Sequence, residues 1–227
     1  MIKNITFSVL VIVSSIFCQE QKPTVAVLRF ENNSLMEKEA YDGLKKGLCD
    51  MMVTELKKIS ALKVLEREKL EAVLTELELA QSDVIDVSSA PKIGKLLGAQ
   101  HLMFGGFVKD LGKKIRIDIR MVKVETGEVI KAVEATGKAK ALFKLIKKLS
   151  YKIADELEVK VTKEDKKLIE KSDKVSMQVL LVYSEGLELL DGGKHQEALK
   201  KFTKALDMDK SFERAKLQIK KIEDAKE

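Results

Sequence analysis

The chain has 227 residues, with 42 lysines and arginines against 36 aspartates and glutamates, and a formal charge of +6. Basic and acidic residues are interspersed along most of it, which is typical of solvated faces and argues against a nucleic-acid-binding patch. The 2 cysteines are Cys18 and Cys49, and removal of the first with a leader would exclude an intrachain disulfide. The fold must then be stabilised by ordinary hydrophobic cores.

The N-terminus predicts a secretory signal peptide over residues 1–18. Lys3 precedes an uncharged apolar run, residues 5–17, that is too short to span a bilayer as a helix. Cleavage after Cys18 would leave an exported protein that begins at Gln19. The alternative is a lipoprotein signal, because Cys18 stands where a lipidated cysteine would, although Phe17 is larger than the residue such a signal prefers.

The first strand and helices are expected over residues 24–97. TVAVLRF, residues 24–30, is a short β-branched run that predicts a buried strand. An amphipathic helix is expected over residues 40–56, followed by a second strand at LKVLE and a helix over residues 67–80, with Leu70, Val73, Leu74 and Leu77 on one stripe. Ser88 or Ser89 can cap a further short helix that has Pro91 in its first turn.

Three antiparallel strands are expected over residues 100–139. They are joined by tight turns at LGKK and ETGE, and the middle strand alternates apolar with charged residues. This alternation slips at Met121-Val122, which predicts a bulge. A last helix is expected over residues 142–157. The elements predict an α+β domain, a mixed sheet with an antiparallel three-stranded meander and with helices covering one face.

The glycine-rich stretch GKLLGAQHLMFGGF raises the question of a nucleotide site. A phosphate-binding loop places its glycines after a strand and before a helix. Here Gly98 follows a helix and precedes a strand, where a left-handed helix cap is expected. Gly105 and Gly106 fall within the strand, where glycine marks a bulge or a close backbone approach. The stretch therefore predicts a helix–strand joint.

Residues 161–227 predict helices only. The part from Ser176 onward resembles a tetratricopeptide repeat, although Lys210 replaces the closing proline and Leu189 an aromatic residue. The small and aromatic positions of the repeat are occupied by Gly186, Gly193, Ala198, Phe202 and Ala205. A third helix, residues 212–224, is expected to act as its cap. Because one repeat cannot bury a solenoid core alone, we expect it to bind a partner segment or a neighbouring subunit; the alternative is that it folds back on the sheet domain.

Four stretches of the sheet domain occur in the order of a known family: TVAVLRF, KVLEREKLEAVLTELEL, PKIGKLLGAQHLMFGGFV and the ETGEV turn. Residues 24–157 thereby resemble the curli production assembly/transport (CsgG-like) family. The resemblance implies an envelope protein of secretion or surface assembly that often forms rings. The pore-forming relative inserts long transmembrane hairpins for which the short turns here leave no residues, so the fold is expected to carry over and the pore activity is not.

The sequence predicts no catalytic, cofactor-binding or metal-binding residues. His101 lies in an expected strand and His195 in the turn between the repeat helices, without cysteine or acidic residues at metal-ligand spacing. Cys49 is expected to be a buried helix residue, and Asp83 and Asp86 to be solvated. The sequence contains no Walker, nucleophile-elbow or zinc motif, so we expect a protein that is not an enzyme.

One helix face is strongly basic. Residues 138–152 contain no acidic residue, and the helix has an apolar stripe on its other face. A solvated face is the simpler interpretation, and attraction to an anionic membrane or envelope polymer is the alternative. The lysines of this face are Lys140, Lys144, Lys147, Lys148 and Lys152.

These patterns predict a signal peptide, residues 1–18, a CsgG-like α+β domain, residues 24–160, and a helical repeat-like segment, residues 161–227. The expected function is that of a non-enzymatic scaffold or oligomeric component of secretion or surface-structure assembly, in the periplasm or at the outer-membrane periphery. The alternative is a periplasmic ligand- or peptide-binding sensor or adaptor. Expected partners are proteins that bind the repeat-like segment, and not nucleic acid; homo-oligomers and peripheral outer-membrane association are left open.

Overall fold

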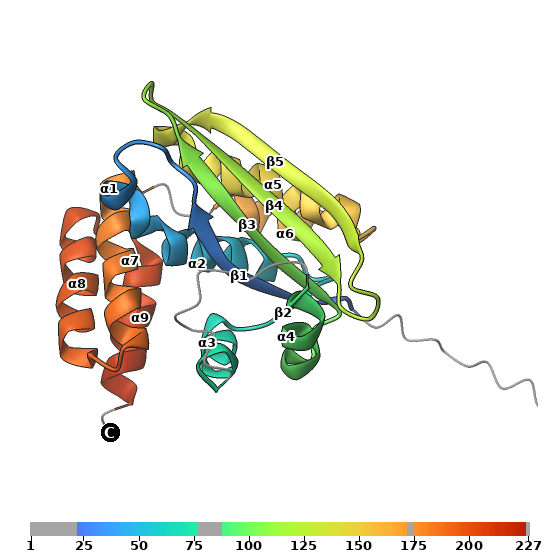
Figure 1. The fold of residues 1–227 in the computed structure, drawn as a ribbon. Helices are drawn as coiled ribbons and strands as arrows, with labels where there is room; N and C mark the ends of the chain where they lie inside the picture. Colours follow the sequence, from blue (N-terminus) through green and yellow to red (C-terminus); the bar gives the residue numbers. More distant parts are fainter. Residues whose placement is uncertain (1–21, 77–87, 172–174, 226–227) are drawn as a thin grey trace, which may run out of the picture.

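The computed structural model describes residues 22–76, 88–171 and 175–225 (Figure 1). The predicted signal peptide with Cys18 lies outside these residues, as do Leu77, Asp83 and Asp86. Among the described residues, no helix is both long enough and apolar enough to cross a bilayer.

A five-stranded mixed sheet lies at the centre of the described chain, in the order β2-β1-β3-β4-β5. β1 pairs in parallel with β2 and β3, and β3, β4 and β5 form the predicted antiparallel meander. The bulge predicted at Met121-Val122 is confirmed, because the register of β4 against β5 shifts there. The strands are β1 (Thr24–Asn32), β2 (Lys63–Val64), β3 (His101–Lys109), β4 (Lys114–Lys123) and β5 (Val129–Lys138).

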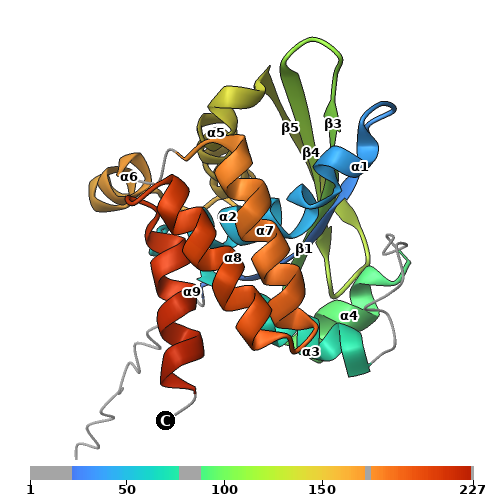
Figure 2. The ribbon, with the colours of Figure 1, turned by 90° about the vertical axis from the view of Figure 1, so that its left-hand side faces the viewer.

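The helices pack around this sheet, and α7, α8 and α9 lie side by side next to α2 (Figure 2). The helix predicted over residues 40–56 is divided at Gly43, and LKVLE forms a strand of only two residues. The helices are α1 (Lys38–Asp42), α2 (Leu44–Lys57), α3 (Arg67–Glu76), α4 (Ala90–Leu97), the short 3-10 turn η1 (Ala139–Ala141), α5 (Leu142–Glu156), α6 (Lys163–Glu170), α7 (Met177–Asp191), α8 (His195–Met208) and α9 (Glu213–Asp224).

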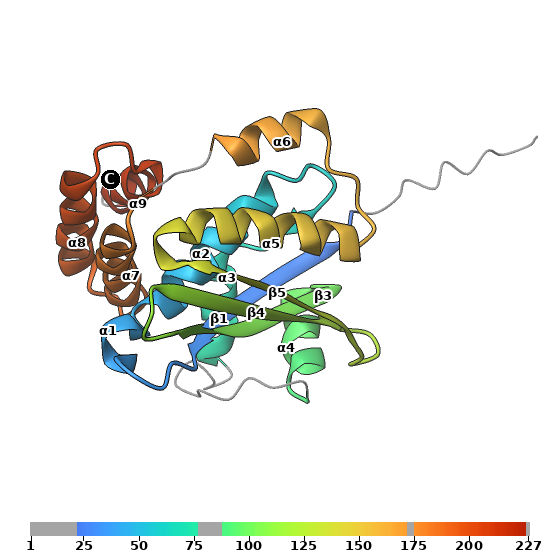
Figure 3. The same cartoon turned by 90° about the horizontal axis from the view of Figure 1, so that it is seen from above.

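Helices cover both faces of the sheet, so the prediction that they cover one face is wrong. α2 and α5 lie on one side, and α3 and α4 lie on the other (Figure 3). β1 contributes alternate residues to two cores, with Val25 and Val27 on the α2 side and Ala26 and Leu28 on the α4 side. A strand buried on both faces has a continuous apolar run, and TVAVLRF has that pattern. β4 alternates instead, because its other side is exposed along most of the strand and is covered only near Val122.

The glycines of the helix–strand joint have the predicted roles. Gly98 ends α4 in the left-handed conformation, with φ of 67°. Within β3, a Cβ added at Gly105 would lie 1.9 Å from the backbone oxygen of Asp118 on β4, so this strand pair requires a residue without a side chain. The joint carries no nucleotide-binding geometry, because Gly98 stands at the C-terminus of its helix.

We expect Gly105→Ala to lower the free energy of unfolding by about 2 kcal/mol or more, because the β3 and β4 backbones would have to separate. Urea unfolding followed by circular dichroism measures the change. Gly112→Ala in the β3–β4 turn is the matched control, since a Cβ there would meet its nearest atom at an ordinary 3.5 Å. Equal stability of the two variants would contradict the close approach.

Candidate functional site: the junction of α2 and α3 with the C-terminal helices

Helix α7 lies directly against α2. A Cβ added at Gly47 on α2 would lie 2.0 Å from the Ser184 hydroxyl oxygen and 3.3 Å from a Leu180 methyl carbon, so the contact needs a glycine. Ser184 donates to the carbonyl of Leu180 (2.8 Å) and is thereby satisfied within its own helix. The structure therefore shows the second of the two arrangements considered for the repeat-like segment, in which it folds back on the sheet domain.

Aromatic packing holds α7, α8 and α9 together. The Tyr183 ring centroid lies 5.3 Å from that of Phe202 and 5.0 Å from that of Phe212. A Cβ at Gly186 would meet the Phe202 ring at 2.5 Å, which is the small-residue contact that the tetratricopeptide resemblance implies. All three rings belong to the same buried cluster as the α2 face of the sheet, so the core is continuous. The repeat assignment itself stays a prediction.

Charged side chains of α2, α3, α7 and α9 surround this apolar contact. We call these side chains, together with the four helices, the junction. At the end of α7, Asp191 accepts from Lys46 of α2 (2.7 Å) and from Arg67 of α3 (2.6 Å). Lys46 also pairs with Glu188 (2.9 Å). The Arg67 side chain is only 2% exposed and that of Asp191 15%, so this pair is shielded from water. One carboxylate thus connects three helices.

A second set of polar contacts joins α2 and α3 to α7 and α9. Glu55 pairs with Arg214 of α9 (3.2 Å), and both side chains are buried. The Tyr183 hydroxyl donates to Asp50 (3.1 Å), and Lys221 pairs with Glu68 of α3 (3.1 Å). These polar groups are paired across the contact, and the pairing offsets much of the free-energy cost of removing them from water.

The protonation behaviour of the junction follows from burial and charge. Burial opposes the charged form of Arg67, but the hydrogen bonds and charge of Asp191 outweigh it and raise its pKa. The same balance with Asp191 and Glu188 raises the pKa of Lys46. Asp50 differs, because burial raises its pKa and the positive charges of Arg214 and Arg67 offset this only in part. The surroundings of Asp50 therefore disfavour its charged form.

The residues considered for chemistry in the sequence are not brought together. Among the described residues, no three His, Cys, Asp or Glu side chains are grouped so that they could hold a metal ion. His101 begins β3, where burial and then Lys123 lower its pKa. Cys49 is buried, as expected; its thiol donates to the Val27 carbonyl (3.2 Å), and burial raises its pKa. A buried thiol with a raised pKa is a poor nucleophile.

Two of the lysines on the basic helix face are engaged within the chain. Lys147 of α5 donates to the backbone oxygen of Glu170 (3.1 Å), and Lys152 donates to that of Glu134 on β5 (2.8 Å). The apolar stripe on the other side of α5 is buried, as predicted. The basic face is therefore partly used to hold α6 and β5 against α5, and Lys140, Lys144 and Lys148 remain exposed.

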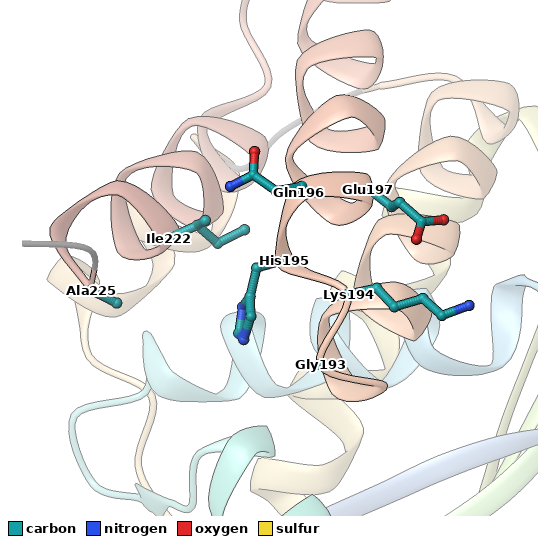
Figure 4. Close-up of a pocket in the computed structure, with 7 residues that line it drawn as sticks. All are labelled: Gly193, Lys194, His195, Gln196, Glu197, Ile222 and Ala225. Carbon is teal, nitrogen blue, oxygen red and sulfur yellow. The ribbon is translucent and has the colours of Figure 1, made fainter.

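The outward side of the C-terminal helices carries shallow hollows. One of about 460 Å³ lies between the start of α8 and the end of α9, with His195 and Gln196 on one side and Ile222 and Ala225 on the other (Figure 4). A second, of about 450 Å³, follows α8 along Leu199 and its polar neighbours. His195 thus begins α8 and belongs to an exposed surface, whereas the sequence predicts it in the turn between the repeat helices.

The charged residues of the junction were not singled out in the sequence. From the sequence alone, the interspersed charges of the chain in general are interpreted as solvated faces, since an isolated helix shows no difference between a charge in water and a charge paired across an interface. The available signal was Gly47, because a glycine in a helix interior is unfavourable and often marks close packing.

Comparison with known proteins supports the family resemblance for the first part of the chain. Residues 13–110 match the family described as "Curli production assembly/transport component CsgG". The match covers less than half of the chain; it runs through β1, β2 and β3 and ends in the β3–β4 turn. No curated protein matches the chain.

Three solved structures resemble part of the fold. They are the LpoB C-terminal domain from Salmonella enterica (19% identity over 52% of this chain and 83% of that one, TM-score 0.36), lipoprotein GNA1162 from Neisseria meningitidis (14%, 59% and 98%, TM-score 0.42) and the PelC dodecamer from Paraburkholderia phytofirmans (13%, 60% and 88%, TM-score 0.36). The architecture is an α+β domain with a mixed sheet. The sequence match to the CsgG family covers residues 13–110, which include the β1, β2 and β3 strands of that domain.

We expect Arg67→Met to lower the free energy of unfolding by about 3 kcal/mol, because it leaves a shielded carboxylate with one cationic partner fewer. Urea unfolding at neutral pH measures the loss. Lys210→Met is the matched control: its pair with Asp207 is exposed on both sides, and removing such a pair costs below about 1 kcal/mol. A loss for Arg67→Met as small as for the control would show that the junction contributes little.

Asp50 predicts a pH dependence of stability. Since its pKa is raised in the folded protein, folding takes up a proton as the pH falls from neutral toward about 4, and this group's contribution to stability grows over that range. Asp50→Asn keeps an acceptor for Tyr183 and removes the titration. We expect the variant to be favoured over wild type most at pH 7 and the difference to shrink as the pH is lowered. A difference that is constant with pH would contradict the raised pKa.

Proposed function

We propose that this protein is an exported, non-enzymatic component of cell-envelope assembly or secretion that acts as a scaffold. The observation that carries the proposal is the match of residues 13–110 to a family described by curli production, assembly and transport. The proposed location is the periplasm or the outer-membrane periphery.

The junction suggests how such a scaffold would work. Because α7 and α9 are attached to α2 and α3 through a continuous core and shielded ion pairs, the C-terminal helices form one body with the sheet domain. A partner bound by them would be held in a set orientation to the sheet. The surface left for that partner is the outward side of α8 with its two hollows, since α7 is buried against α2. A repeat-like segment commonly uses such a surface for protein segments.

Photo-crosslinking in cells of the source organism tests this role. A crosslinkable residue at Leu199 or Thr203 on α8 should give protein adducts of defined mass in the envelope fraction. Exposed Leu168 on α6 is the matched position that should give none. Deleting residues 176–227 would be a poorer experiment, because it would also uncover α2 and destabilise the sheet domain.

Two results would contradict the scaffold role. One is recovery of the protein in the cytosol, and the other is the absence of any adduct from α8. Stabilisation of the purified protein by a small molecule or a peptide, without protein adducts in cells, would favour the alternative of a periplasmic sensor or adaptor.

A further inference from the structure

One end of the sheet presents apolar side chains to water. β1 runs into a loop that carries Leu35 and Met36, 95% and 55% exposed, and the β3–β4 turn carries Leu111, 76% exposed. These two loops lie at the same end of the sheet, opposite the start of β1 (Figure 3). Large apolar side chains this exposed, at the tips of two neighbouring loops, are a feature of surfaces that contact an apolar phase or a partner.

The two loops are held together by backbone contacts, so the exposed side chains have a firm base. Asn33 donates its backbone N–H to the Phe107 carbonyl (2.8 Å), and Lys109 donates its own to the Ser34 hydroxyl (2.9 Å). The Lys109 ammonium also lies 5.5 Å from the centre of the Tyr41 ring. Leu35 and Leu111 therefore project from adjacent, hydrogen-bonded segments.

Lysines surround the apolar tips. Lys114 of β4 lies opposite Lys138 of β5 in the strand register, and Ala139 donates its N–H to the Lys113 carbonyl (2.7 Å). These residues therefore lie next to one another. The carboxylates at this end are Glu31, Glu37, Glu39, Asp42 and Asp110. Lys45 pairs with Glu31 and Asp42, and Asp110 accepts the backbone N–H groups of Lys113 and Lys114. The lysines at this end are Lys38, Lys45, Lys109, Lys113, Lys114, Lys138 and Lys140, so positive charge prevails.

We propose that this end of the sheet binds the surface of an anionic lipid bilayer, with Leu35, Met36 and Leu111 entering the interface and the lysines contacting lipid headgroups. Apolar side chains next to lysines whose long stems can reach the headgroup level are the pattern that interfacial binding uses. A second copy fits less well, because it would bring the same positive end against this one and like charges would repel.

The proposal goes beyond the scaffold role and does not depend on it, because the surface involves neither the junction nor α8. Membrane binding would orient the molecule so that the end of the sheet opposite the start of β1 faces the bilayer.

Vesicle binding tests the proposal with residues 19–227, which keep every residue that the structure describes. The protein should sediment with vesicles of phosphatidylglycerol and phosphatidylethanolamine, and much less with vesicles of phosphatidylcholine alone. Binding should weaken as salt is raised, since the contact is partly electrostatic. Leu35→Ser with Leu111→Ser should lower the partition coefficient about tenfold. Lys113→Gln with Lys138→Gln should lower it about fivefold for each lysine.

Matched controls lie on the C-terminal helices. Met208→Ser with Leu217→Ser removes two exposed apolar side chains, and Lys204→Gln with Lys220→Gln removes two exposed charges, and both should leave binding unchanged. Circular dichroism confirms that each variant is folded.

Three results would overturn the proposal. They are the failure of the wild-type protein to bind anionic vesicles, equal binding by the Leu35 and Leu111 double variant, and an equal loss with the controls. If the double variant changed the mass of the protein in solution by light scattering but not its vesicle binding, the surface would be a contact between copies and the membrane proposal would be wrong. The assay contains no protein partner, so its outcome is separate from that of the scaffold proposal.

Discussion

The contact of α2 with α7 is the interaction on which the rest of the structure depends. α2 packs against the sheet on one side and against α7 on the other, so its side chains belong to a single continuous core. This requires a helix that is apolar on more than one face and a residue without a side chain where α7 crosses it. Gly47 provides the second. A larger residue there would separate the two halves of the core.

The charges at the junction complete this contact. Apolar surface stabilises the association without specifying how the helices align, whereas Asp191, held by Lys46 and Arg67, and Arg214, held by Glu55, define which ends meet. A shielded ion pair adds little net stability over apolar packing, but it makes a shifted alignment costly because each shift leaves a charge unpaired. The junction is thus better understood as an alignment device than as a source of stability.

The proposals place two different surfaces on one rigid body. The outward side of α8 is polar, shallow and carried by helices, which suits a protein segment. The β1–α1 loop and the β3–β4 turn combine exposed leucines with lysines, which suits a lipid surface. If both are used, the continuous core between them would hold a bound protein at a set height and angle relative to a membrane. That is a physical reason for the repeat-like helices to pack directly against α2 of the sheet domain.

The sequence by itself determined the local features whose cause is local. The meander, its bulge at Met121-Val122 and the cap at Gly98 follow from alternation and backbone freedom, and all are present. The buried thiol of Cys49 was also predicted from residue type, and the close packing of a small residue, Gly186, against Phe202 is what the tetratricopeptide resemblance implies. The tertiary structure decided what lies opposite each element. It placed α3 and α4 on the second face of the sheet, where periodicity could not distinguish one apolar side from the other. It also converted Lys46, Asp50, Glu55 and Arg67 from apparent solvent-facing charges into the junction, because pairing across helices depends on residues more than a hundred positions away.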